Sequence, residues 1–112
     1  SYQPRRGVLV VGPITIGDDV LIGAYSHLGP GVRIGSGSRL EHAVRIGAHS
    51  IVGPNTRIGA GTAIYNGVRI GADVTIGKGC LLPSGTRVAD GSRIPDGTVM
   101  LPTGAALVRS DA

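Results

Sequence analysis

The chain carries one aliphatic residue or methionine at every sixth position over nearly all of its 112 residues. This register starts at Val10, ends at Met100 and is not interrupted between them. A short repeat of fixed length is typical of solenoids, in which each unit buries its apolar side chain only by stacking on its neighbours. The members of the register are Val10, Ile16, Ile22, Leu28, Ile34, Leu40, Ile46, Val52, Ile58, Ile64, Ile70, Ile76, Leu82, Val88, Ile94 and Met100.

A second column lies two residues before each aliphatic position and holds small or β-branched residues, such as Ser26, Val44 and Thr62. Side chains two apart in a strand share a face. Each hexad therefore predicts a short strand with two inward side chains and one outward side chain between them. Glycine recurs one residue and three residues after the aliphatic position, as at Gly35 and Gly37. Since glycine permits positive φ and close backbone approach, each strand is expected to end in a sharp corner.

Hexads such as Ile34-Gly-Ser-Gly-Ser-Arg and Ile58-Gly-Ala-Gly-Thr-Ala resemble the repeat of the hexapeptide-repeat proteins. The resemblance implies an all-β fold, a left-handed parallel β-helix of triangular section with three hexads in each coil. The register then gives about five coils of about 18 residues, with no inserted loops. We expect residues 1–7 to be a leader, residues 8–104 to form the β-helix, and residues 105–112 to form a C-terminal tail or cap.

The composition suits a narrow aliphatic core, because the chain has 20 Gly, 3 Tyr and neither Phe nor Trp. No apolar run reaches the roughly 18 residues of a membrane-spanning helix, and no charged-then-apolar segment typical of a signal peptide is present. The single cysteine, Cys80, excludes an internal disulfide and lies in the inward column, where we expect it to be buried. These features favour a cytoplasmic location.

Placing three hexads in each coil assigns every outward residue to one of three faces. Face A is largely apolar, and an uncovered apolar strip usually marks an interface, so Ala63, Leu81 and Val99 are predicted to contact other subunits. The resemblance implies a homo-oligomer, a trimer of prisms packed along their axes. The outward residues are Leu9, His27, Arg45, Ala63, Leu81 and Val99 on face A, Thr15, Arg33, Ile51, Arg69 and Arg87 on face B, and Leu21, Arg39, Arg57, Thr75 and Arg93 on face C.

Faces B and C are ladders of arginine, in line with the formal net charge of +4. A stacked pair such as Arg39 and Arg57 either holds a phosphate or carboxylate between its guanidinium groups or is screened by water and aspartate. Nucleic acid is not an expected partner, because the arginine faces lack the aromatic residues on which bases stack. A membrane is not an expected partner either.

All three histidines border one predicted strand, residues 44–46. His42 precedes this strand, His49 follows it, and His27 is placed one coil below its outward residue, Arg45. The separations between them do not match the histidine spacing of zinc sites in hexapeptide-repeat carbonic anhydrases, so no metal site is predicted. The predicted substrate-binding residues around the strand are His27, Glu41, Arg45, Tyr65 and Asn66.

One activity follows from the resemblance to acyltransferases with this repeat. These enzymes use one histidine as a general base on a hydroxyl or amine, with acyl-CoA lying in the groove between two prisms. The resemblance therefore implies His42 or His49 as the catalytic base. It also implies acetyl-CoA or another acyl-CoA as cofactor and an intersubunit active site.

A different role follows from the segment Ser38-Arg-Leu-Glu-His-Ala-Val44. It is similar to hexads in the C-terminal β-helix domains of sugar-nucleotide pyrophosphorylases, where the helix oligomerises or regulates and a separate domain is catalytic. The chain has no Gly-rich phosphate loop followed by a helix, and its unbroken register leaves no loop from which to build a site. We therefore favour a noncatalytic scaffold or oligomerisation module of a sugar-nucleotide (nucleotidyltransferase) enzyme. The alternatives are the acyltransferase and a designed or idealised solenoid without activity.

Overall fold

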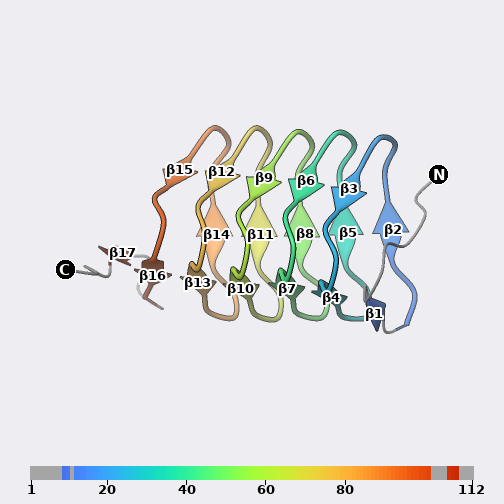
Figure 1. Ribbon diagram of the computed structural model, residues 1–112, viewed down its shortest axis with the longest axis horizontal. Coiled ribbons are helices and arrows are strands. Elements are labelled where there is room, and N and C mark those ends of the chain that lie inside the picture. The colour runs from blue at the N-terminus through green and yellow to red at the C-terminus, as the bar shows by residue number, and fades with distance from the viewer. Residues whose placement is uncertain (1–8, 11, 102–105, 109–112) are drawn as a thin grey trace.

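The computed structural model describes residues 9–10, 12–101 and 106–108, which form a parallel β-helix with no α-helix among them (Figure 1). Short strands follow one another around a triangular section, and equivalent positions of successive coils are 18 residues apart. The molecule measures 38 × 25 × 22 Å. The predicted leader, residues 1–7, lies outside the described residues, as do residues 105 and 109–112 of the predicted tail.

Three sheets form the sides of the prism and confirm the predicted faces, since His27 pairs with Arg45 and Arg39 pairs with Arg57. Sheet A contains, in order, β1 (Leu9–Val10), β4 (His27–Leu28), β7 (Arg45–Ile46), β10 (Ala63–Ile64), β13 (Leu81–Leu82), β16 (Thr98–Met100) and β17 (Ala106–Val108). Sheet B contains β2 (Thr15–Ile16), β5 (Arg33–Ile34), β8 (Ile51–Val52), β11 (Arg69–Ile70) and β14 (Arg87–Val88). Sheet C contains β3 (Leu21–Ile22), β6 (Arg39–Leu40), β9 (Arg57–Ile58), β12 (Thr75–Ile76) and β15 (Arg93–Ile94).

The last strand departs from the parallel arrangement. β17 runs antiparallel to β16, with Thr98 opposite Val108 and Met100 opposite Ala106. It therefore forms the outer strand of sheet A at this end, whereas β14 and β15 are the outer strands of sheets B and C. The predicted tail or cap thus contains a strand that returns along sheet A.

The core is one continuous stack of inward aliphatic side chains. Ile22, Leu28 and Leu82 are completely buried, because the second residue of each strand from β2 to β15 points into the prism. Cys80 is buried in the same stack, as predicted. From β2 to β16 the outward residue of each strand is exposed or half-buried.

Buried serine and threonine hydroxyls connect successive coils. The Oγ of Ser50 donates a hydrogen bond to the carbonyl oxygen of Tyr65 at 2.7 Å and accepts one from the N–H of Val68 at 3.1 Å. Ser38 and Thr62 bind the following coil in the same way. The polar members of the inward column are therefore satisfied inside the core.

The two glycines of a corner serve different purposes. The glycine directly after the aliphatic residue lies against the next coil, so a Cβ on Gly59 would meet the backbone of Gly77 at 2.5 Å. The third corner residue has positive φ in every corner from residue 19 to residue 97. Glycine is common there, as at Gly61 with φ 72°, but Ala43 (φ 58°) and His49 (φ 62°) adopt the same conformation.

Candidate functional site

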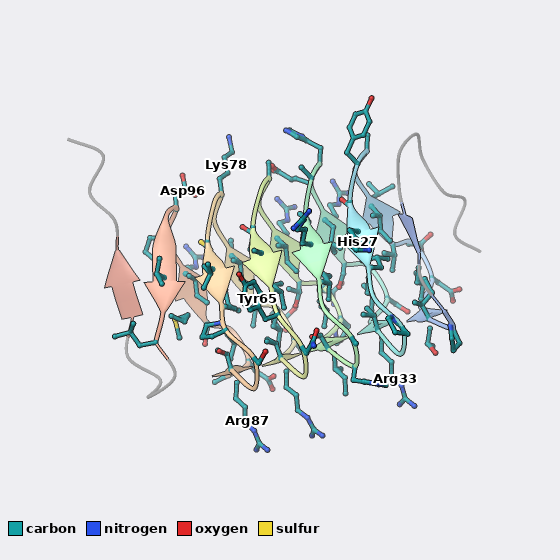
Figure 2. All side chains as sticks on the ribbon, turned by 90° about the horizontal axis from the view of Figure 1, so that it is seen from below. His27, Arg33, Tyr65, Lys78, Arg87 and Asp96 are labelled. Carbon is teal, nitrogen blue, oxygen red and sulfur yellow. The ribbon has the colours of Figure 1, made fainter. Side chains whose placement is uncertain are left out.

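A shallow groove on face A brings together four of the five predicted substrate-binding residues. His27 and Arg45 are the outward residues of β4 and β7, which pair side by side. Tyr65 and Asn66 begin the corner after β10 and line the same groove. The groove has a volume of about 510 Å³ and is open to solvent. Figure 2 shows His27 and Tyr65 on this side of the prism.

The polar side chains of this groove keep hydrogen-bond donors available. The Oδ1 of Asn66 accepts a hydrogen bond from the N–H of Ala48 at 3.0 Å, which leaves the amide NH2 group free to donate. The side chains of His27, Arg45 and Tyr65 form no hydrogen bond with any described residue. Tyr65 is 49% exposed, whereas His27 is half-buried. The groove therefore offers a guanidinium, an imidazole, a phenol and an amide to a polar ligand.

The two predicted catalytic histidines lie outside this groove. His42 is in the corner before β7 and His49 is in the corner after it, so they occupy opposite edges of face A. Both side chains are exposed, and the imidazole of His49 packs against Gly31 of the preceding coil. Within the described residues, no hydrogen bond links either histidine to a hydroxyl or thiol. A single chain thus contains no assembled pair of nucleophile and base at these positions.

Glu41, the fifth predicted substrate-binding residue, is separated from the other four. It lines a second groove, on face C, of about 490 Å³, together with Arg39 and Arg57. No arginine in the part of the chain that is described forms an ion pair with a carboxylate. Asp90, near the arginines of face B, instead accepts a hydrogen bond from the N–H of Ala72 through Oδ1.

Several residues of the face A groove were not predicted from the sequence, among them Pro30, Ala48 and Ser84. Together with Asn66 they recur at intervals of 18 residues, in the second position of the corner that follows face A. This corner column has the same period as the outward columns. The 18-residue spacing of this column would therefore have identified these lining residues of the groove from the sequence.

Among residues 9–10, 12–101 and 106–108, no three His, Cys, Asp or Glu side chains are close enough to hold a metal ion together. The described chain also contains no helix long and apolar enough to cross a membrane.

Solved structures that share this fold include two acetyltransferases. Serine acetyltransferase isoform 3 from Entamoeba histolytica, solved in complex with cysteine, has a TM-score of 0.71 and 20% sequence identity. A variant of perosamine N-acetyltransferase from Caulobacter crescentus, solved with CoA and GDP-perosamine, has a TM-score of 0.56 and 21% identity. Each aligns with 94% of this chain, but the chain spans only 39% and 54% of their lengths. No curated protein sequence matches the chain.

The sequence itself matches a family model described as Bacterial transferase hexapeptide (six repeats). The model matches three times, over residues 13–48, 26–60 and 55–90, and these overlapping segments include more than half of the chain. They coincide with the coils in which the inward residues and the corner residues recur every six positions. The chain therefore belongs to the bacterial transferase hexapeptide family.

Proposed function

We propose that the chain is a noncatalytic β-helical module that associates with copies of itself through face A. In this role it serves as the scaffold of a transferase such as a sugar-nucleotide (nucleotidyltransferase) enzyme. The observation that carries the proposal is the apolar strip of Ala63, Leu81 and Val99, which stack in adjacent strands of sheet A. All three are only half-buried within one chain. Contiguous apolar surface that is open to water favours association with another surface.

The regularity of the coil supports a structural role. Strands recur from Thr15 to Met100 without an inserted loop, so no described segment leaves the prism to close a site. Both large grooves are open to solvent on the single chain. A trimer with face A turned towards a common axis buries the strip of every copy in one symmetric interface.

The substitution Leu81→Glu tests this assembly. It places a carboxylate at the centre of the strip, between Ala63 and Val99, and is expected to convert the oligomer into monomers, because burying an unpaired charge opposes association. Sedimentation velocity of the purified chain measures the change. Ile51→Glu is the matched control, since Ile51 is an outward residue of face B. A monomeric wild-type chain, or equal dissociation by both substitutions, contradicts the proposal.

Acyl transfer is the second candidate function, and the groove of His27, Arg45, Tyr65 and Asn66 specifically favours it. The groove borders the edge of face A, where a neighbouring prism would approach in a trimer. One of the similar structures was solved with CoA and a sugar nucleotide, which are ligands that present phosphate, hydroxyl and amine groups. The free donors of the groove suit such groups.

The positions of His42 and His49 fit an intersubunit site. They lie in the same coil at the two edges of face A. In a parallel trimer, His49 therefore lies at the same height as the partner subunit's His42. Either histidine would take the proton from an acceptor hydroxyl or amine as its oxygen or nitrogen attacks the acyl-CoA thioester carbonyl. The carbon–sulfur bond then breaks and the CoA thiolate leaves and is protonated.

Calorimetry with acetyl-CoA separates the two candidates. Saturable binding that is abolished by His42→Ala or His49→Ala supports acyl transfer and overturns the scaffold proposal. Asn55→Ala is the matched control for His49, because Asn55 has the same positive φ and packs over a glycine, Gly37, in the same manner. Absence of binding to the wild-type oligomer, or equal loss in the Asn55 variant, removes the acyltransferase candidate.

A further inference from the structure

Two unpaired arginines stack on face C. Arg39 of β6 and Arg57 of β9 are direct register partners, and both side chains are exposed. Adjacent strands lie about 4.8 Å apart, so the stems of the two side chains run side by side. Like charges directly opposite each other destabilise a sheet. Neither guanidinium forms an ion pair with a carboxylate of the described residues.

The pair lines the face C groove of about 490 Å³. Thr75 is the register partner of Arg57 on the other side, so its hydroxyl extends the same column. Lys78 and Asp96 lie on the rim, at the corner between faces C and A. Figure 2 shows Lys78 and Asp96 on the side of the prism opposite Arg33 and Arg87 of face B.

The acidic residues of the groove do not neutralise the pair. The Oδ1 of Asp96 accepts a hydrogen bond from the backbone N–H of Lys78 at 2.8 Å, so this oxygen is engaged with the corner. Glu41, also on the groove, makes no ion pair with a described residue. Three cationic and two carboxylate side chains line the groove, which leaves it an excess of positive charge.

We propose that Arg39, Arg57 and Thr75 form a binding site for a phosphoryl group. A guanidinium presents a planar fork of donors that fits an oxyanion in a bidentate manner. The three terminal oxygens of a phosphoryl group form edges that share one oxygen, so each of two stacked guanidinium groups can bind one edge. One of the same oxygens can also accept a hydrogen bond from a hydroxyl. A carboxylate has only two oxygens, and a bidentate pair with one guanidinium uses both, so a carboxylate fits two stacked arginines less well than a phosphoryl group does. A dianion between the arginines also removes their mutual repulsion.

Face B also carries a stacked arginine pair, but no groove of the described residues is lined by both of its members. Arg69 and Arg87 are also register partners, but Arg69 lines neither the face A groove nor the face C groove. Its other register partner is the apolar Ile51. The proposed face C site combines the stacked pair of Arg39 and Arg57, the groove that both line, and the hydroxyl group of Thr75. It lies on a different side of the prism from the assembly strip and does not rest on the proposed function.

Titration calorimetry at constant ionic strength, with inorganic phosphate, pyrophosphate and acetate as probes, tests the site. We expect saturable binding of phosphate or pyrophosphate and none of acetate. The double variant Arg39→Gln/Arg57→Gln is expected to bind the phosphoryl probe at least tenfold more weakly. Pyrophosphate bound more tightly than phosphate indicates a diphosphate ligand, and the reverse indicates a monoester.

The matched control is Arg33→Gln/Arg69→Gln, which removes the same charge from face B and is expected to leave binding unchanged. Equal weakening by both double variants, equal binding of acetate and phosphate, or no binding to the wild-type chain overturns the proposal. The variant Arg39→Lys/Arg57→Lys keeps both charges, so it is a second test that does not depend on whether the glutamine variant folds. It is expected to weaken binding because it lacks the bidentate fork, and unchanged affinity in it also overturns the proposal.

Discussion

At the scale of single residues, the two corner glycines have different physical reasons for lacking a side chain. Gly59 has no room, because a Cβ would meet the backbone of Gly77 and Lys78 at 2.5 to 2.6 Å. Gly61 has open space around it, since a Cβ there would meet nothing within 4 Å, and only its φ of +72° disfavours a side chain. The sequence does not distinguish the lack of space at Gly59 from the positive φ at Gly61, because both positions are glycine.

This difference predicts unequal costs for two similar substitutions. Gly61→Ala is expected to lower the free energy of unfolding by about 1 to 2 kcal/mol, the strain of the left-handed region. Gly59→Ala is expected to cost more, about 3 kcal/mol, because two coil backbones must move apart. Urea unfolding followed by circular dichroism measures both. A larger effect at Gly61 than at Gly59 would contradict the assignment, and Ala43→Gly, in the same column as Gly61, is expected to stabilise the fold.

At the scale of elements, successive coils are held together by hydroxyl groups as well as by the strand ladders. The N–H of Val68 binds the Oγ of Ser50 in the coil below. Thr62 lies above Val44, which has no hydroxyl, and its N–H instead donates a hydrogen bond to the carbonyl oxygen of Gly59 in its own corner at 3.4 Å. An N–H of this column can therefore bind either a hydroxyl of the coil below or a carbonyl of its own corner.

The substitution Ser50→Ala is expected to destabilise the fold by only about 1 kcal/mol. Two groups lose their partner, the N–H of Val68 and the carbonyl of Tyr65, but they can bind each other as the equivalent groups of Thr62 and Gly59 do. Leaving both buried and unpaired would cost about 2 to 6 kcal/mol. Thermal and urea unfolding distinguish these magnitudes, and a loss in the higher range would show that the local switch does not occur.

The strands and their faces could be predicted from the sequence because one period governs both burial and pairing. Once Leu28 and Ile46 are recognised as inward residues of the same face, the pairing of His27 with Arg45 follows. β17 could not be predicted in this way, since it lies beyond the last repeat and runs antiparallel. A period of six carries no information about a strand that reverses direction.

The candidate site was predictable in part. Outward columns placed His27 beside Arg45, but the division of the polar residues between two grooves depends on the shape of the corners. Glu41 lies only four residues from Arg45 yet lines the other groove, because the corner at residues 41–44 turns the chain from face C to face A. The short separation of Glu41 and Arg45 in the sequence therefore does not place their side chains in the same groove.

At the scale of the whole molecule, the chain is a one-dimensional stack in which each coil contacts only the coils above and below it. Such a stack is expected to open from its ends, because a terminal coil has one neighbour and a central coil has two. The backbone hydrogen bonds themselves do not differ. The N–H groups of Thr15, near one end, and Ala63, in the middle, both bind the next coil at 2.9 Å.

Hydrogen exchange followed by NMR is therefore expected to show at least tenfold slower exchange at Ala63 than at Thr15, despite equal bond lengths. The amide of Leu21, one strand after Thr15, serves as a second terminal reference, bound to Ser38 at 3.0 Å. Equal protection at all three amides would mean that the chain opens only as a whole.

Because all coils have the same length, one whole coil can be removed from the chain without changing the register of the others. Removing residues 53–70, one coil of 18, would join Val52 to Gly71, which takes the place of Gly53 and leaves every later residue on its own face. The prism would shorten by one strand spacing of about 4.8 Å. Removing only residues 53–58 would preserve the core equally well but turn every later outward residue to a neighbouring face. The surface pattern, and not the core, therefore restricts changes in length to whole coils.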